Sequence, residues 1–235
     1  MKILTPLLER HNVKKVAIVG SQEFTRDDAP FDDSTYEIWG YADHVCYDWM
    51  KRCDALFEIH QPNVYMNHPR TPQYWGELQK LTIPVYMYPV ADPRIPGAVE
   101  YPLEDVLSLV KNGRQYNTPF KPLNYTGAFA MALAILQGYD VVDVYGTELF
   151  NASDYSEQAH TFSFWNGVAV GRGITLNINC SKGMFVHPLY GLEDTVERAK
   201  LKAYRRVLEK QIANAHKTIA MGEGGLQVIE ELTKR

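Results

Sequence analysis

Short apolar runs alternate with segments of helical spacing along most of the chain. The apolar runs are rich in β-branched and aromatic residues and predict strands at Lys15–Val19, Tyr36–Gly40, Ala55–His60, Pro84–Pro89, Val141–Tyr145 and Ile174–Asn179. The remaining segments predict helices at Thr71–Leu81, Leu103–Lys111, Phe129–Leu136, Tyr155–Val170, Leu192–Lys217 and Gly225–Leu232. Because strands alternate with helices, we expect an α/β fold with a Rossmann-like, mostly parallel sheet and helices on both faces. The first strand should lie near the centre of that sheet.

The last part of the chain differs from the rest because it shows no strand pattern. We expect a Rossmann-like nucleotide-binding domain over residues 1–190 and a C-terminal helical extension, residues 191–235, packed on it. Basic residues follow one face of the longer predicted helix. A solvated face is the favoured interpretation of that pattern, and a nucleic-acid surface is the less favoured one.

Composition narrows the class of protein. The 235 residues are 46% hydrophobic and 22% charged, with a formal net charge of -4, which favours neither disorder nor a general polyanion-binding surface. The three cysteines lack metal-site spacing and favour a reduced intracellular protein. The first residues lack the apolar core of a signal peptide, and no run of about 18 apolar residues could span a bilayer. We therefore expect a cytoplasmic protein that makes no membrane contact.

The stretch Asn124–Glu148 carries the most information about a ligand. It has the pattern of an apolar helix, a turn at Gly138 and a buried strand. Thr126 is a candidate N-cap, so the first backbone N–H groups of the helix would point outward with the positive end of the helix dipole. Such an end binds phosphate or carboxylate, and we assign the predicted anion seat to Tyr125, Thr126 and Gly127. The alternative is a purely structural helix and strand.

Residues after three predicted strands supply further candidates, because open α/β sheets bind ligands at the carboxyl ends of their strands. The candidate ligand-binding residues at these ends are Gly20, Ser21, Gln22, Trp39, Gly40, Gly146 and Thr147. The first three could curl around a phosphate, but they match neither the G-x-G-x-x-G nor the P-loop motif, and a plain turn is equally favoured. Trp39 could stack on a base, and a core Trp is equally favoured.

Three side chains are candidates for acid–base chemistry. His60 ends the third predicted strand, where an imidazole can transfer a proton or bind phosphate, although a single His is often structural. His160 lies near the start of a predicted helix, downstream of Glu148, and we expect these two to face one crevice and share a proton. The alternative places His160 on a solvated helix face. His187 is expected to line the same pocket.

The sequence predicts neither a metal site nor a covalent nucleophile. The paired acids Asp27-Asp28 and Asp32-Asp33 fall in a predicted loop without a D-x-D that follows a strand, so we assign no metal. No G-x-S-x-G elbow surrounds Ser21 or Cys180, and a covalent acyl mechanism therefore has no support.

Several segments taken together resemble known proteins. A resemblance to phage-encoded Rossmann-like proteins covers most of the chain and rests on VAIVGSQ, APFDDSTYEIWG, DALFEIHQP, PVYMYP, YTGAFAMALAILQGYDVVDVYGTE, an H-T-F and HPLYG. More remotely, the helix, the strand, the Gly-x-acid and the later His are similar to family 42 sialyltransferases. That resemblance implies a CMP-activated sugar bound without a metal, with Gly20-Ser21 near the nucleotide and His160 as general base. The first loop here lacks the Pro of that family's G-P-S element, and Glu148 stands where relatives often have Asp.

The leading hypothesis is a metal-independent, glycosyltransferase-like enzyme. It would bind a nucleotide-activated sugar as substrate, hold no permanent cofactor and transfer the glycosyl group to a hydroxyl, with a hydroxymethylated base of phage DNA as one acceptor. One alternative is a nucleotide phosphohydrolase or pyrophosphate-transfer enzyme. Another is a non-enzymatic phage protein that binds a host factor or a nucleotide signal. Assembly into a homo-oligomer stays open, and a phage-encoded protein would act in the bacterial cytoplasm.

Overall fold

The computed structural model describes residues 13–110, 122–147, 149, 153–179 and 198–234. The chain forms two compact units, Met1–Cys180 and Ser181–Arg235, which are described separately below. Glu148 and His187, two of the residues singled out from the sequence, lie outside the described residues.

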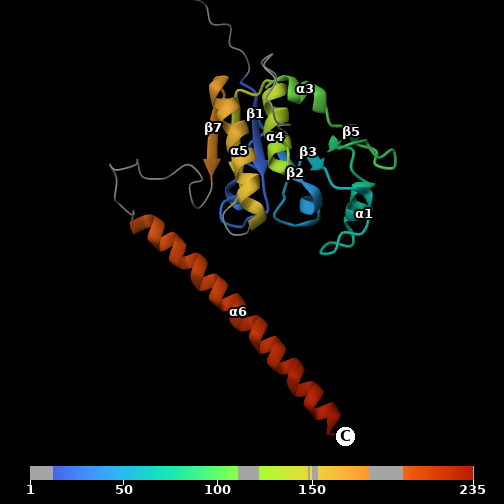
Figure 1. Ribbon diagram of the computed structural model, residues 1–235, viewed down its shortest axis with the longest axis vertical. Coiled ribbons are helices and arrows are strands. Elements are labelled where there is room, and N and C mark those ends of the chain that lie inside the picture. Colours follow the sequence, from blue (N-terminus) through green and yellow to red (C-terminus); the bar gives the residue numbers. More distant parts are fainter. Residues whose placement is uncertain (1–12, 111–121, 148, 150–152, 180–197, 235) are drawn as a thin grey trace, which may run out of the picture. The chain divides into compact units, whose positions relative to one another are not determined.

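The first unit is built on a seven-stranded parallel sheet (Figure 1). Its strands are β1 (Lys15–Val19), β2 (Tyr36–Tyr41), β3 (Ala55–Glu58), β4 (Val85–Met87), β5 (Ala98–Glu100), β6 (Val141–Tyr145) and β7 (Thr175–Asn179). They lie in the order β5-β4-β3-β2-β1-β6-β7, and every neighbouring pair is parallel. The α/β fold expected from the sequence is therefore confirmed, with β1 between β2 and β6 in the interior of the sheet.

The helices vary widely in length. They are the 3-10 helices η1 (Arg26–Asp28) and η2 (Ala42–Cys46) and the α-helices α1 (Pro62–Tyr65), α2 (Tyr74–Leu78), α3 (Leu103–Ser108), α4 (Thr126–Leu136), α5 (Ser153–Gly171) and α6 (Arg198–Thr233). Two differences from the sequence prediction stand out. Helix α2 begins after Thr71, whose hydroxyl bonds to Asp43 instead of capping a helix. Helix α6 continues through Gly222 and Gly224, where the sequence predicted a break between two helices.

The two faces of the sheet are covered by different parts of the chain. Residues 127–135 of α4 are all buried, and α4 packs against β1, β2, β3 and α5, as expected for a helix that is apolar all round. On the other face, Ala17 and Val19 of β1 pack with Ile38 of β2 under Ala29 and Phe31. Those last two residues belong to the β1–β2 connection, which contains η1 and no α-helix. The loop itself therefore covers the sheet there.

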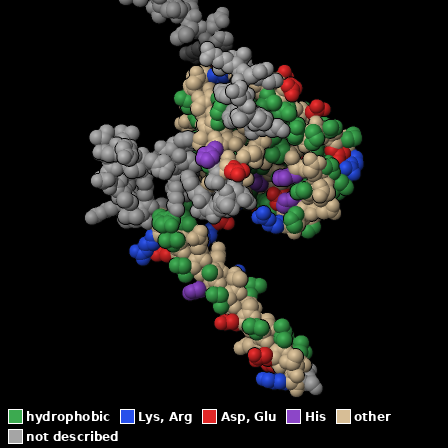
Figure 2. All heavy atoms as spheres, in the orientation of Figure 1, with side chains coloured by type: hydrophobic (Ala, Val, Ile, Leu, Met, Phe, Trp, Pro, Cys, Tyr) green, Lys and Arg blue, Asp and Glu red, His purple; other side chains and the backbone are tan. Residues whose placement is uncertain are grey.

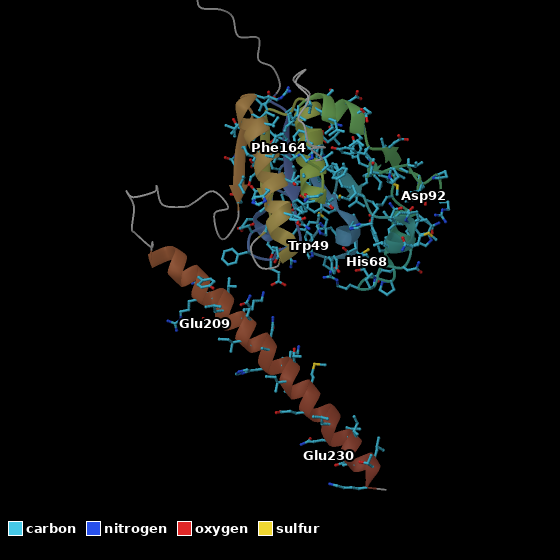
Figure 3. All side chains as sticks on the ribbon, in the orientation of Figure 1. Trp49, His68, Asp92, Phe164, Glu209 and Glu230 are labelled. Carbon is cyan, nitrogen blue, oxygen red and sulfur yellow. The ribbon has the colours of Figure 1, made fainter. Side chains whose placement is uncertain are left out.

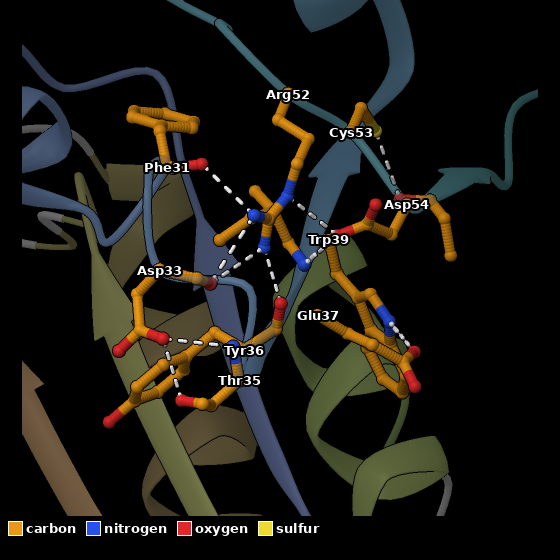
Figure 4. A network of polar contacts seen from close by, with 11 residues as sticks. Phe31, Asp33, Thr35, Tyr36, Glu37, Trp39, Arg52, Cys53 and Asp54 are labelled. Carbon is orange, nitrogen blue, oxygen red and sulfur yellow. Dashed lines mark hydrogen bonds and ion pairs between the residues drawn. The ribbon is translucent and has the colours of Figure 1, made fainter.

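Arg52 fixes that loop to the sheet (Figure 4). Its guanidinium donates hydrogen bonds to the backbone carbonyls of Phe31, Asp33 and Tyr36 and forms an ion pair with Asp54 at 3.1 Å. The Asp54 carboxylate in turn accepts the N–H of a β2 residue. Because one side chain satisfies two loop carbonyls and the first carbonyl of β2, the β1–β2 loop is held in a defined path across the sheet.

In the second unit the structure describes α6, a helix of 36 residues. Within the described ranges, no helix of either unit combines the length and apolar character needed to cross a membrane.

Candidate functional site

The strand order reverses between β1 and β6, and the loops that follow these two strands are in direct contact. The N–H of Gly20 donates to the carbonyl of Tyr145 at 2.8 Å, and the N–H of Gln22 donates to the carbonyl of Gly146 at 2.9 Å. A Cβ on Gly20 would lie 2.4 Å from the Gly146 oxygen, and Gly146 has φ +58°. These glycines permit a close backbone approach. The two N–H groups are engaged within the protein and are not phosphate donors in this arrangement.

The predicted anion seat at the start of α4 is covered by an aromatic ring. The helix begins at Thr126, and Tyr125 rather than Thr126 occupies the N-cap position. A Cβ on Gly127 would lie 2.4 Å from Cε1 of Tyr125, so the Tyr125 ring rests directly on the first turn. The Tyr125 hydroxyl lies 3.5 Å from Oγ1 of Thr147, and its ring centroid is 6.3 Å from that of Tyr41. Tyr125, Gly127 and Thr147, which are candidates from the sequence, therefore lie close together, but the Tyr125 ring covers the N-terminal end of α4.

A polar cavity of about 460 Å³ lies at the carboxyl ends of β1 and β2. Its lining residues are Ser21, Glu23, Arg26, Asp43, His44, Tyr47, Trp49, His68 and Arg70. Trp49 and His68 both lie at the end of the α/β unit toward which the β7 arrow points (Figures 1 and 3). Imidazole and basic side chains also gather at this end in Figure 2. Ser21 is the one lining residue that the sequence analysis had proposed.

Cationic and aromatic groups are arranged together in this cavity. The Arg26 guanidinium lies over the Trp49 ring, 4.7 Å from its centroid, and donates to the Ser21 carbonyl at 2.8 Å. The Tyr47 and Trp49 rings stack at 6.1 Å with an interplanar angle of 16°. Arg70 is exposed, and it has no ion-pair partner within the described part of the chain. Guanidinium groups beside flat rings suit a phosphate joined to a base.

Asp43 and His68 form a second polar contact in the lining of the cavity. Asp43 accepts hydrogen bonds from the hydroxyls of Thr71 and Tyr47 and lies 3.6 Å from Nδ1 of His68. Partial burial would raise the pKa of Asp43, but the two hydroxyls and the nearby imidazoles hold it below its usual value. Asp43 is therefore a carboxylate beside His68, whose buried Nδ1 makes no hydrogen bond among the described residues.

His44 has a structural role. Burial lowers its pKa to about 4, so the imidazole is neutral near pH 7. Its Nδ1 accepts the N–H of Tyr41 at 3.2 Å, and its ring packs on Tyr41 and Trp49. His44 thereby holds Trp49 in place at the cavity wall.

A buried carboxylate orients His60 at the end of β3. Glu58 is 1% exposed, and its Oε1 lies 2.7 Å from Nδ1 of His60 and accepts the backbone N–H of His60 at 2.9 Å. Its Oε2 accepts the hydroxyl of Tyr74 at 2.6 Å. The hydrogen bond from Glu58 raises the pKa of His60 above its usual value, although partial burial opposes the shift.

The His60 side chain is 46% exposed, so a substrate can reach its second nitrogen, Nε2. The pair is linked to the cavity, because the His68 ring packs edge-on against Tyr74 at 5.6 Å. An imidazole with one nitrogen fixed by a carboxylate and the other accessible has the geometry of a general base.

Other sequence candidates lie apart from this group. His160 is exposed on α5, and no hydrogen bond or ion pair joins its side chain to another residue that the structure describes. Trp39 is 1% exposed, with its ring against Phe57 and Tyr139, so it belongs to the core and cannot stack on a ligand in this arrangement. A Cβ on Gly40 would lie 2.9 Å from the Met50 methyl, which makes close packing the local need for glycine.

Most of the cavity was missed from the sequence. Glu58 had a usable signal, because residues two apart in a strand point to the same face, and Glu58 therefore shares a face with His60. Arg26 and Asp43 lie in short 3-10 helices and His68 lies in a loop, and no sequence spacing reveals that they converge. Within the described residues, no three His, Cys, Asp or Glu side chains are grouped as metal ligands.

Comparison with known proteins gives only remote likeness. No protein-family model matches the chain, and no curated protein matches it. Among solved structures, sialyltransferase CstII from Campylobacter jejuni with cytidine-5'-monophosphate is 15% identical, with a TM-score of 0.43 over 72% of this chain and 80% of that one. The same enzyme with CMP-3FNeuAc is 14% identical, with a TM-score of 0.45 over 73% and 83%.

The alpha-2,3-sialyltransferase from Campylobacter jejuni in apo form is 13% identical, with a TM-score of 0.41 over 85% of this chain and 96% of that one. Because identities and TM-scores are this low, we base the functional proposal on the residues of this chain.

Proposed function

We propose that the protein is a glycosyltransferase-like enzyme that moves a sugar from a nucleotide donor to a hydroxyl acceptor. The observation that carries this proposal is the exposed His60 imidazole, fixed by buried Glu58, which is joined through Tyr74 and His68 to a cavity with two arginines and a stacked aromatic pair. The cavity supplies groups suited to a nucleotide phosphate, and the imidazole supplies a base for a hydroxyl. Both are needed for glycosyl transfer, and neither alone would suggest it.

In the proposed reaction the donor lies in the cavity. Its phosphate oxygens accept hydrogen bonds from Arg26 and Arg70, and its base packs on the Tyr47–Trp49 stack. The acceptor oxygen attacks the anomeric carbon as the bond from that carbon to the phosphate oxygen breaks, and the nucleotide leaves with the bonding electrons. The two guanidinium groups stabilise the charge that develops on the leaving phosphate.

His60 takes the acceptor proton in this scheme. Its Nε2 accepts the proton as the new glycosidic bond forms, and Glu58 stabilises the imidazolium through the hydrogen bond at Nδ1. His160 with Glu148, proposed from the sequence, stays an alternative base pair. The proposed reaction needs no metal and no permanent cofactor, so the two corresponding expectations from the sequence remain part of the proposal.

The test offers the protein a panel of nucleotide sugars together with hydroxyl acceptors and follows product mass. Saccharides and DNA containing hydroxymethylated bases are separate acceptor arms, because the resemblance to phage proteins suggested the second. We expect an acceptor-dependent mass increase equal to one glycosyl unit. His60→Gln should abolish it, while Lys80→Gln, which removes only an exposed ion pair on α2, should leave it unchanged.

Two outcomes would replace the proposal. Release of phosphate or pyrophosphate without any glycosylated acceptor would favour a nucleotide phosphohydrolase or pyrophosphate-transfer enzyme. Failure of every nucleotide and nucleotide sugar to raise the melting temperature would favour a non-enzymatic binding protein, since a bound ligand stabilises the folded state by mass action.

A further inference from the structure

Helix α2 places a tyrosine hydroxyl against the carboxylate that holds His60. Tyr74 lies in α2, is fully buried and donates its hydroxyl to Oε2 of Glu58 at 2.6 Å. The other oxygen of Glu58, Oε1, accepts the backbone N–H of His60 and lies 2.7 Å from Nδ1 of that residue. One buried carboxylate is therefore shared between a tyrosine hydroxyl on one oxygen and the proposed base on the other.

Tyr74 acts as the donor in this contact. Burial and the Glu58 carboxylate raise the pKa of Tyr74 well above its usual value, so its hydroxyl keeps its proton near pH 7. Among the described residues, the other groups that donate to Glu58 are the backbone N–H and Nδ1–H of His60. Tyr74 and His60 therefore supply between them the hydrogen bonds of a carboxylate that is only 1% exposed.

The two sides of the carboxylate affect each other through its charge. A hydroxyl that donates to a carboxylate stabilises the charged form, so the carboxylate gains less from an imidazolium on its other oxygen. This effect is strong where water is excluded and few other donors are near. Without the Tyr74 hydroxyl, the buried charge of Glu58 would depend more on the His60 imidazolium, and His60 would release its proton less readily.

We propose that Tyr74 is a positioning residue that acts on His60 through Glu58 and makes the imidazole release its proton more readily. Glu58 raises the pKa of His60, whereas a general base has to be unprotonated when the acceptor hydroxyl arrives. Tyr74 limits the effect of Glu58 and so keeps more of the imidazole in the basic form. The catalytic part of this inference rests on the proposed function, but the effect on the His60 proton does not.

Other titratable groups face this contact from the neighbouring elements. Asp43 of η2 acts on both Tyr74 and His60, and Cys46 of η2 acts on Tyr74. Burial raises the pKa of Cys46 to about 11, so its thiol is uncharged near pH 7. The His68 ring packs edge-on against Tyr74 at 5.6 Å. Phenylalanine at position 74 keeps the ring and all of these neighbours, so an effect of that substitution reports the lost hydroxyl.

The first experiment follows the His60 imidazole of the full chain by NMR titration and needs no substrate. We expect Tyr74→Phe to move the titration midpoint of His60 to higher pH. Tyr65→Phe is the matched control, because it removes another buried hydroxyl, which donates to Asp92 at 2.8 Å, and should leave the midpoint unchanged. An unchanged or lower midpoint in Tyr74→Phe, or an equal shift in both variants, would overturn the proposal.

Replacing Glu58 tests whether it carries the effect. Glu58→Gln alone should move the His60 midpoint to lower pH, because the negative charge beside the imidazole is lost. Adding Tyr74→Phe to Glu58→Gln should then change the midpoint little. A midpoint that Glu58→Gln leaves in place, or an undiminished effect of Tyr74→Phe in that background, would mean that Tyr74 does not act through Glu58.

The second experiment measures kcat and the donor KM for glycosyl transfer as functions of pH. Tyr74→Phe should lower kcat at neutral pH, and the loss should disappear as the pH rises and His60 loses its proton. The donor KM should stay unchanged, because the ring against His68 is kept. A loss that is constant with pH would indicate a merely structural role and overturn the proposal for Tyr74. Absence of any transfer by the natural chain would instead refute the proposed function, and the NMR midpoints would still decide whether Tyr74 acts on His60.

Discussion

Two neighbouring parts of the carboxyl edge of the sheet are filled in opposite ways. Between β1 and β6, main chain from the two loops meets directly through the hydrogen bonds of Gly20 and Gln22. At the carboxyl ends of β1 and β2, charged and aromatic side chains surround a cavity, and buried Glu58 fixes His60 at the end of the next strand, β3. The first part is closed by backbone, whereas the second presents functional groups to solvent.

This difference shows how far strand order alone can predict the position of a ligand-binding site. The reversal of strand order between β1 and β6 marks the position where open α/β sheets usually bind ligands. Here that position is occupied by Gly20 and Gly146, whose missing side chains let the two loops touch. Loop glycines serve either ligand approach or backbone approach, and only the surrounding atoms distinguish the two. The cavity lies next to this position, at the carboxyl ends of β1 and β2, and the proposed base follows β3.

The largest effect is expected on the rate of glycosyl transfer when His60, in the part that presents functional groups to solvent, is replaced. His60→Ala should lower the rate of glycosyl transfer by about 10²- to 10⁴-fold, because it removes the proposed general base. His160→Ala is the matched control, and we expect it to lower the rate by less than about tenfold, since α5 holds His160 on an exposed face. Initial rates with saturating donor decide between them. The reverse order of effects would assign the base to His160, as the sequence analysis had proposed.

The contact between the loops after β1 and β6 can be tested through the free energy of unfolding. Gly146→Ala should lower the free energy of unfolding by about 2–5 kcal/mol, because the new Cβ would lie 2.4 Å from the Gly20 oxygen in a left-handed conformation. Gly138→Ala should lower it by only about 1–2 kcal/mol, since its φ is +68° but nothing lies within 4 Å of the added carbon. Urea denaturation measures both. Equal losses would mean that the two loops do not touch.

A smaller effect is expected on nucleotide affinity when Arg70, the cavity arginine without a described ion-pair partner, is replaced. Arg70→Gln should weaken nucleotide binding by about tenfold to a hundredfold, which corresponds to one charge-assisted hydrogen bond to phosphate. Lys80→Gln, just after α2, removes an equal charge and should leave affinity unchanged. Isothermal titration calorimetry at fixed salt separates the two variants. If Lys80→Gln weakens binding as much, the loss reflects net charge and not the cavity.

The sequence predicted the fold far better than the site, and particular segments show why. Five of the six predicted strands lie in the buried interior of the sheet, where apolar runs such as Val16–Val19 reflect burial directly. Strand β5 was missed because Ala98–Glu100 is a three-residue edge strand with exposed side chains. Helix α6 was predicted to end before its glycines, but it continues through them.

The site was only partly predictable because its residues come together through tertiary structure. His60 was found from its place at a strand end, and Glu58 could have been found from the two-residue period of a strand. Asp43, in the short helix η2, and His68, in a loop, are 25 positions apart, and no local pattern shows that they meet. Trp39 illustrates the opposite error, because a strand-end position suggested a ligand platform and the ring instead fills the core.

The smallest expected effect is the pH dependence of stability that the Glu58–His60 contact creates. The hydrogen bond from Glu58 raises the pKa of His60 in the folded protein, whereas the unfolded chain has a pKa of about 6.5. The folded state therefore binds the proton more tightly, and the resulting stabilisation is fully present below about pH 6.5. It is lost as the pH rises through the folded pKa.

His60→Gln should remove this dependence, so its stability should fall below that of the natural chain mainly at acidic pH and approach it at alkaline pH. His160→Gln controls for the loss of an exposed imidazole that has no described carboxylate partner. Thermal denaturation from acidic to alkaline pH measures the difference for each variant. A difference for His60→Gln that is constant with pH, or that grows as the pH rises, would mean that Glu58 does not hold the protonated imidazole.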